Sequence, residues 1–172
     1  MARDATARQS DVDADSVKLS VEGDSGSYLP GKITFAAKKG KSVDLNRLRA
    51  DLQETRLGKR TSSKVVYLEI TATGKVVEAG KELKLNVGGT TEQFVLGENP
   101  KDKPKKDEKT ALARLREAVA KGKKVVSVTG RVQGWSGTWP TVLKELAAEQ
   151  AKEPDKRKTP LLYVTDFEVA KE

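Results

Sequence analysis

The chain contains no histidine and no cysteine among its 172 residues. Histidine is the side chain most often used for proton transfer in catalysis, and cysteine is among the strongest protein nucleophiles, so their absence argues against an enzyme. The lack of cysteine also excludes disulfide bonds and thiolate metal sites, but it identifies no cellular compartment. We therefore expect a binding protein without catalytic residues, cofactor or bound metal.

Aromatic residues and long hydrophobic runs are also scarce. Aromatic residues make up 5% of the chain, so a core has to be filled mainly by valine, leucine and alanine. No apolar stretch approaches the length that crosses a bilayer, and the acid-rich first thirty residues contain no apolar signal-peptide segment. The chain as it stands is expected to be cytoplasmic, or exported if it is a processed form, so the compartment stays open.

Positive charge is what the chain has in excess. It carries 33 lysines and arginines against 25 aspartates and glutamates, a net charge of +8. The excess is densest in residues 31–62, where nine basic residues accompany three acidic ones. Such a surface attracts nucleic acid, anionic lipid and acidic proteins alike, so the charge does not select among these partners.

The first third of the chain predicts a tail and a small βα segment. Residues 1–14 are polar and show no hydrophobic period, which predicts a flexible acidic tail. Residues 15–62 predict two strands, near 17–22 and 32–37, followed by a helix. We expect this segment to lead into the larger part of the fold, residues 63–172.

The helix of the βα segment has clear ends. Ser42 or Asp44 can cap its first turn, and Gly58 ends it. Its leucines fall on one face, which predicts an amphipathic helix with a cationic exterior. Three arginines on that exterior form a candidate contact surface: Arg47, Arg49 and Arg56.

Residues 63–172 predict the larger part of the fold. The pattern indicates three antiparallel strands, a helix near 110–121, a long strand, an insertion with a helix near 138–151, and a last strand. This order matches the OB fold, a five-stranded barrel with a helix between its third and fourth strands. Gly74 and Gly130 lie within the two longest strands, where a closed small barrel needs bends. The alternative is an open antiparallel sheet with helices on one face.

Several stretches resemble bacterial proteins that carry a heavy-metal-associated domain. These are residues 32–44 (KITFAAKKGKSVD) and 67–74 (YLEITATG), with shorter runs at 128–131 and 162–166. The resemblance implies a ferredoxin-like scaffold for the βα segment. Such domains bind soft metals through a C-x-x-C pair, which this chain lacks, so the metal function does not carry over. The expected fold class is therefore α+β and mostly β: a five-stranded OB-like barrel preceded by a small ferredoxin-like βα segment.

Acidic residues near the N-terminus are spaced like those of an EF-hand calcium loop. Asp11, Asp13 and Asp15 are followed by Glu22 at the end of the matching interval. The sixth position of such a loop needs glycine for a sharp turn, but Ser16 occupies it, and no helix is predicted before the loop. We favour an acidic tail leading into an edge strand over a calcium site.

The segment 134–140 (GWSGTWP) contains both tryptophans of the chain. In an OB fold it would connect strands four and five, beside the usual ligand face. Trp135 and Trp139 can anchor a protein partner or stack on bases, whereas in the alternative interpretation both rings are packed against the fold. The function that we expect is protein binding, as an accessory subunit or adaptor, through this segment and the cationic helix.

Single-stranded nucleic-acid binding is the alternative function. The predicted barrel offers one aromatic ring for base stacking, Phe94, and three cations for phosphate contact, Lys81, Lys84 and Arg131. A stacking surface needs more than one ring, so this function ranks second. The two functions differ in salt response, because a phosphate-driven complex weakens steeply as salt rises and an apolar protein contact does not.

Overall fold

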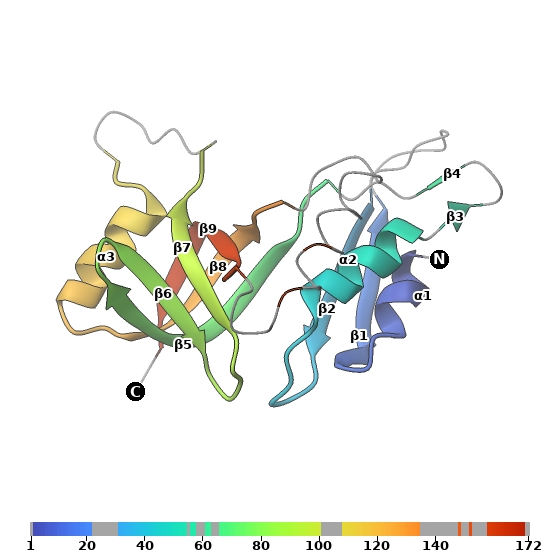
Figure 1. The fold of residues 1–172 in the computed structure, drawn as a ribbon, viewed down its shortest axis with the longest axis horizontal. Helices are drawn as coiled ribbons and strands as arrows, with labels where there is room; N and C mark the ends of the chain where they lie inside the picture. The colour runs from blue at the N-terminus through green and yellow to red at the C-terminus, as the bar shows by residue number, and fades with distance from the viewer. Residues whose placement is uncertain are drawn as a thin grey trace. The chain divides into compact units, whose positions relative to one another are not determined.

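The computed structural model describes residues 2–21, 31–54, 56–57, 61–62, 66–100, 108–134, 148, 152 and 158–170. These residues divide into two compact units, and the chain passes from unit 1 to unit 2 between residues 62 and 66. The described part of unit 1 contains two helices and two small sheets, and that of unit 2 contains five strands and a helix (Figure 1). The fold is α+β and mostly β, as the sequence predicted.

Unit 1 follows the order helix, strand, strand, helix, and then a short strand pair. The elements are α1 (Ala2–Ala7), β1 (Val12–Val21), β2 (Gly31–Ala37), α2 (Leu45–Glu54), β3 (Arg56–Leu57) and β4 (Thr61–Ser62). β1 pairs antiparallel with β2, and β3 with β4. The register between β1 and β2 shifts between Asp13 and Lys18, which places a bulge in β1.

The first fourteen residues are not the flexible tail that the sequence predicted. α1 begins at Ala2, and β1 is already formed at Val12. Their polar side chains are used within unit 1: the buried Thr6 donates from Oγ1 to Ala2 O at 3.0 Å, and Gln9 donates from Nε2 to Asp51 Oδ2 at 2.5 Å. The prediction was wrong because polar composition was equated with exposure, whereas these groups have partners inside the fold.

Among the described residues of unit 1, the second helix is capped as predicted and few apolar side chains are buried. The Arg47 N–H donates to Asp44 Oδ1 at 3.0 Å, so Asp44 is the N-cap of α2. α1 packs against β1 and α2. The buried apolar side chains of this unit come from β1, from α2 and from the residue before its cap: Val12, Val17, Val43, Leu48 and Leu52.

Unit 2 is a closed ring of five strands with a helix in the connection between the third and the fourth. The elements are β5 (Glu69–Ala79), β6 (Glu82–Val87), β7 (Gln93–Glu98), α3 (Ala111–Ala120), β8 (Val125–Val132) and β9 (Leu161–Val169). The strands pair in the order β5-β6-β7-β9-β8, and β8 pairs back to β5. Every pair is antiparallel except β7 with β9, which is parallel. Because the ring is closed, the open sheet is not the arrangement formed.

Alternate residues of the ring strands point inward and fill its core. α3 packs against β7 and β9 and buries one face of its own (Figure 1). Thr110 caps α3, since its Oγ1 accepts from Ala113 N–H at 3.2 Å and donates to Glu98 Oε1 at 2.8 Å. The buried apolar side chains are Val76, Leu83, Leu85, Phe94, Leu96, Ala111, Leu112, Leu115, Val119, Val126, Val128, Val132, Leu162 and Val164, with Leu68 just before β5.

Two glycines lie where neighbouring strands approach most closely. A Cβ at Gly74 would lie 2.0 Å from the backbone oxygen of Asn86, and a Cβ at Gly130 would lie 2.6 Å from the backbone oxygen of Tyr163. No side chain fits at either position, so the close packing of β5 on β6 and of β8 on β9 requires glycine. Both positions were identified in the sequence as points where long strands need glycine.

The second helix predicted for this part of the chain, near 138–151, lies outside the described residues apart from Ala148. Of the helices in the described ranges, none is both long and apolar enough to cross a membrane.

Candidate binding surface

One candidate surface lies where β5, β8 and β9 run side by side. Arg131 is opposite Glu69 in the register of β8 with β5, and opposite Tyr163 in the register of β8 with β9. Its guanidinium lies over the Tyr67 ring, 4.2 Å from the ring centroid, and its Nε is 3.6 Å from Glu69 Oε2. These four residues form a surface that we call the Tyr67 patch: Tyr67, Glu69, Arg131 and Tyr163.

The Tyr67 patch combines exposed apolar area with a compensated charge. Tyr67 is 47% exposed, and Val66, the residue before it in the chain, is 65% exposed. The side chains of Arg131 and Glu69 are also partly accessible, at 40% and 36%. Because the carboxylate of Glu69 already faces the guanidinium, the patch offers aromatic and guanidinium surface with little net charge.

The strands beneath the patch are held in register by side-chain hydroxyls. Thr71 Oγ1 and Thr129 Oγ1 are 2.8 Å apart, and Thr73 Oγ1 and Ser127 Oγ are 2.6 Å apart, so each pair shares a hydrogen bond across β5 and β8. Cross-strand pairs of this kind stabilise a sheet and fix its register. Arg131 is therefore presented from a well-defined strand position and not from a loop.

A second arginine on unit 2 is also paired. Arg114, on α3, has its Nη2 3.9 Å from Asp166 Oδ1 and its guanidinium 6.0 Å from the centroid of the Phe167 ring. Asp166 and Glu168 are both exposed on β9, opposite Thr129 and Ser127. This side of the ring therefore carries carboxylates together with its arginines.

The outward face of β5, β6 and β7 has a different character. Lys75 is opposite Asn86, and Asn86 is opposite Gln93, so the three side chains form a row across these strands. Gln93 donates from Nε2 to Asn86 Oδ1 at 2.6 Å. Lys84 lies one row away, opposite Val95. Within the described ranges, neither Lys75 nor Lys84 forms an ion pair, so this face carries uncompensated positive charge.

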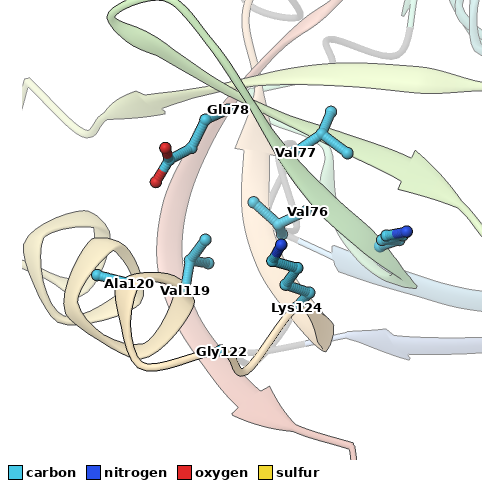
Figure 2. Close-up of a pocket in the computed structure, with 8 residues that line it drawn as sticks. Val76, Val77, Glu78, Val119, Ala120, Gly122 and Lys124 are labelled. Carbon is cyan, nitrogen blue, oxygen red and sulfur yellow. The ribbon is translucent and has the colours of Figure 1, made fainter.

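A hollow of about 580 Å³ lies between β5 and the end of α3. Figure 2 shows Val76, Val77 and Glu78 of β5 on one side, Val119 and Ala120 of α3 on the other, and Lys124 between them. The buried walls are valines, and the rim carries charges of both signs. This combination favours no single class of ligand.

The cations that the sequence predicted for binding belong to different elements of the two units. Arg131 belongs to the Tyr67 patch, Lys84 lies on the outward face of β6, and Arg47 is exposed on α2. Arg49 is only 7% exposed, so its predicted place on a cationic exterior was wrong. Its position on α2 follows the buried Leu48, and the helix turns this arginine inward as well.

Phe94 is also not where nucleic-acid binding requires it. The ring is 2% exposed, because β7 points Phe94 and Leu96 into the core and the residues between them outward. Phe94 therefore cannot stack on a base, and that prediction was wrong. The side chain of Arg56 and the residues Trp135 and Trp139 lie outside the part that the structure describes, so their roles stay predictions.

The acidic segment before β2 does not form a loop. Asp13 and Asp15 lie within β1, where the Asp15 N–H donates to Asp13 Oδ1 at 3.2 Å and Ser16 donates from Oγ to Asp13 O at 2.6 Å. An EF-hand loop wraps its ligands around the ion, which a paired strand cannot do. Across the described ranges, no three acidic, histidine or cysteine side chains lie together as a metal site.

Two tyrosines and a glutamate of the patch were not identified as site residues from the sequence. Tyr67 and Glu69 alternate in the sequence with the residues that point inward, as the exposed Thr71 and Thr73 do. This alternation was the sequence signal that could have placed Tyr67 and Glu69 on the surface. The contact of Tyr67 with Arg131 had no such signal, because it joins positions that only the pairing of β5 with β8 brings together.

Comparisons with known proteins add no assignment to this surface. The chain matches no protein-family model, and neither the curated proteins nor the solved structures include a match.

Proposed function

We propose that this chain is a non-catalytic protein-binding module, and that its Tyr67 patch is a contact surface for a protein partner. The observation that carries the proposal is the exposure of Tyr67 beside an arginine whose charge Glu69 compensates. Tyrosine and arginine are the residue types most enriched in the energetically important parts of protein interfaces. The role expected is that of an accessory subunit or adaptor.

The fold that we propose for unit 2 is an OB-like barrel. Three features support it: the strand order around the ring, the single parallel pair of β7 with β9, and the helix between the third and fourth ring strands. OB folds are used mainly for binding, and their ligand surfaces lie on the outer strand faces and adjoining loops. Because a fold alone does not assign a function, the proposed function depends on the Tyr67 patch.

For unit 1 we propose the ferredoxin-like scaffold that the resemblance implies. The order α1, β1, β2, α2 is the central part of a βαββαβ arrangement. A soft-metal site is not part of this proposal, because the chain has no cysteine to supply thiolate ligands.

The charge on the patch side of unit 2 favours protein over nucleic acid. Arg131 and Arg114 each lie within 4 Å of a carboxylate, from Glu69 and Asp166 respectively. Nucleic-acid binding gains much of its affinity when unpaired cations of the protein neutralise phosphates and counterions leave the nucleic acid. Carboxylates beside the arginines oppose this binding. An apolar and aromatic contact does not depend on net charge in this way.

The test is capture of partners from the native lysate by the purified full chain, after nuclease treatment. We expect a protein that is retained by the wild type and lost with Tyr67→Ser. Val125→Ser is the matched control, because Val125 is 52% exposed on β8 but lies outside the patch. Equal retention by both variants, or recovery of nucleic acid alone from untreated lysate, would contradict the proposal.

Single-stranded nucleic-acid binding remains the second candidate, and one observation favours it. Lys75 and Lys84 lie on the outward face of β5 and β6 without an ion pair in the described ranges, beside the amides of Asn86 and Gln93. Anisotropy of a labelled single-stranded oligonucleotide tests this candidate. Affinity that falls by a large factor as salt rises from about 50 to 200 mM, and that falls further in the double variant Lys75→Gln, Lys84→Gln, would support it. No binding at the lower salt would remove it.

A further inference from the structure

The sheet of unit 1 has an edge that the described residues leave unpaired. β1 and β2 pair with each other and with no third strand in the part that the structure describes. A sheet of two strands is marginally stable by itself and gains from additional strands. The edge of β2 that faces away from β1 is thus a position where a further strand can pair.

The hydrogen bonds to β1 identify which backbone groups of β2 face that edge. The Ala36 N–H donates to Ser16 Oγ at 2.8 Å, and the Lys38 N–H donates to Asp11 O at 2.9 Å, so these even-numbered residues face β1. Successive residues of a strand point their backbone groups to opposite sides. The N–H and C=O groups of Ile33 and Phe35 therefore point to the free edge.

The free edge of β2 lacks the devices that usually block strand addition. Exposed edges are commonly protected by proline, by a bulge or by several charged side chains. β2 contains no proline and a single charged residue, Lys32, and the bulge of this sheet is in β1. Nothing in the sequence of β2 opposes pairing with an extended peptide.

The side chains around the edge describe the peptide that would fit. Residues 31–43 contain four lysines and no acid, and the acids Asp13 and Asp15 belong to β1, on the other side of β2. Lys38 donates from Nζ to Ser10 O on the β1 side, so Lys32 is the lysine that β2 itself carries. An added strand would place alternate residues beside Lys32, where opposite charge stabilises a cross-strand pair. Its other residues would lie beside the half-buried Ile33 and Phe35, which favours apolar side chains there. The four lysines are Lys32, Lys38, Lys39 and Lys41.

We infer that the free edge of β2 binds an extended peptide segment of a partner protein, with acidic and apolar residues in alternation, as an added strand. This surface lies in unit 1 and goes beyond the Tyr67 patch of unit 2. Backbone hydrogen bonds to Ile33 and Phe35 supply affinity, and Lys32 with the apolar positions supplies preference, which is the general mode of recognition by strand addition.

The probe for this inference is a capped peptide as long as β2 in which valine alternates with glutamate. Added to the full chain, it should slow hydrogen exchange at the Ile33 and Phe35 amides, which point away from β1. Two control peptides sharpen the result: one with lysine in place of glutamate, and one N-methylated at alternate residues, which cannot donate. We expect binding weaker by about fivefold for the first and no binding for the second.

Two variants keep the test independent of folding problems. Phe35→Pro removes one outward N–H without removing a hydrogen bond to β1, and it should abolish binding of the valine–glutamate peptide. Lys32→Glu leaves the backbone unchanged and should reverse the preference toward the lysine peptide. Binding that survives N-methylation, or no binding of the valine–glutamate peptide at millimolar concentration, would overturn the inference. The Tyr67→Ser variant should bind the peptide as the wild type does. If the peptide does not bind, the inference about β2 fails, and the proposal that the Tyr67 patch binds a protein is not affected.

Discussion

In unit 2 each of the five ring strands has a neighbour on both sides, whereas in unit 1 each of the two main strands has one described neighbour. Closure pairs the backbone groups of neighbouring ring strands with one another, so the ring offers a partner mainly its side chains. The sheet of unit 1 still presents backbone donors and acceptors at its edge. One chain can thus offer two different kinds of contact: a side-chain patch and a strand edge.

The two units also differ in how their cores are built. The ring surrounds a core of inward-pointing side chains from all five strands, closed by α3. In the described part of unit 1 fewer apolar side chains are buried, and polar groups such as those of Gln9 and Asp51 take part in holding its helices together. The stability of the ring should therefore depend on close packing, and that of unit 1 on a few individual residues.

The largest expected effect tests the close packing of the ring strands. Gly74→Ala places a Cβ against the backbone of Asn86, which has no flexible end to move aside, so β5 and β6 must separate. We expect a loss of about 4 kcal/mol or more in the free energy of unfolding, measured by urea denaturation. Gly88→Ala is the control, because a Cβ there would meet Thr73 O at 3.5 Å, an ordinary contact. Similar stability for the two variants would show that the strands do not approach so closely.

The next effect tests the core of unit 1. Leu48 is fully buried on α2, and Leu48→Ala should lower the free energy of unfolding of this unit by about 3 kcal/mol. Hydrogen exchange is the measurement: the Lys38 amide, bonded to Asp11 O, should lose protection. Leu19→Ala is the control, since Leu19 is 50% exposed and should change little. Unchanged protection of Lys38 in Leu48→Ala would remove Leu48 from the core of unit 1.

A smaller effect concerns the helix that closes the ring. Thr110→Ala removes the cap of α3 and the hydrogen bond to Glu98 Oε1, which should cost about 1 kcal/mol of unfolding free energy. Thr110→Ser retains a hydroxyl at the same position and should restore most of that loss. If serine and alanine gave the same midpoint in urea, the hydroxyl of Thr110 would not be the stabilising group.

The smallest effect is a pH dependence at the surface of α3. The hydrogen bond from Lys109 and its positive charge hold the pKa of Glu117 below the ordinary value of 4.5. The stabilisation that follows is present above the unfolded-state pKa and is lost as pH falls through the lower folded-state pKa. Glu117→Gln should therefore lower the melting temperature slightly at pH 7, and the difference should disappear in strong acid. A difference that grew as pH fell would contradict this assignment.

Much of the fold could be predicted because its signals are local. Alternation of apolar and polar residues predicted the second half of β1, and it predicted β2 and the five ring strands to within a few residues. Asp44 was one of the two caps predicted for α2. Gly74 and Gly130 were informative because a glycine inside a long strand usually marks a bend or a close approach of another backbone. All of these signals come from residues that are neighbours in the sequence.

The predictions that were wrong have physical reasons of another kind. α1 has a polar sequence whose side chains form hydrogen bonds within unit 1. Arg49 is buried on a helix whose sequence indicated a cationic exterior. Phe94 was predicted to be a surface ring although its alternation with Leu96 already placed it inward. Tyr67 and Arg131 meet only through strand pairing, so their stack depends on tertiary structure.

The most direct test of the central claim is photo-crosslinking at the Tyr67 patch. Benzoylphenylalanine is placed at position 67, where it keeps an aromatic side chain, and in a second variant at position 125, on exposed β8 surface outside the patch. After irradiation in the native lysate, we expect a covalent adduct to one protein partner from position 67 and none from position 125. Adducts of equal yield from both positions, or adducts from position 67 to nucleic acid only, would contradict protein binding through this patch.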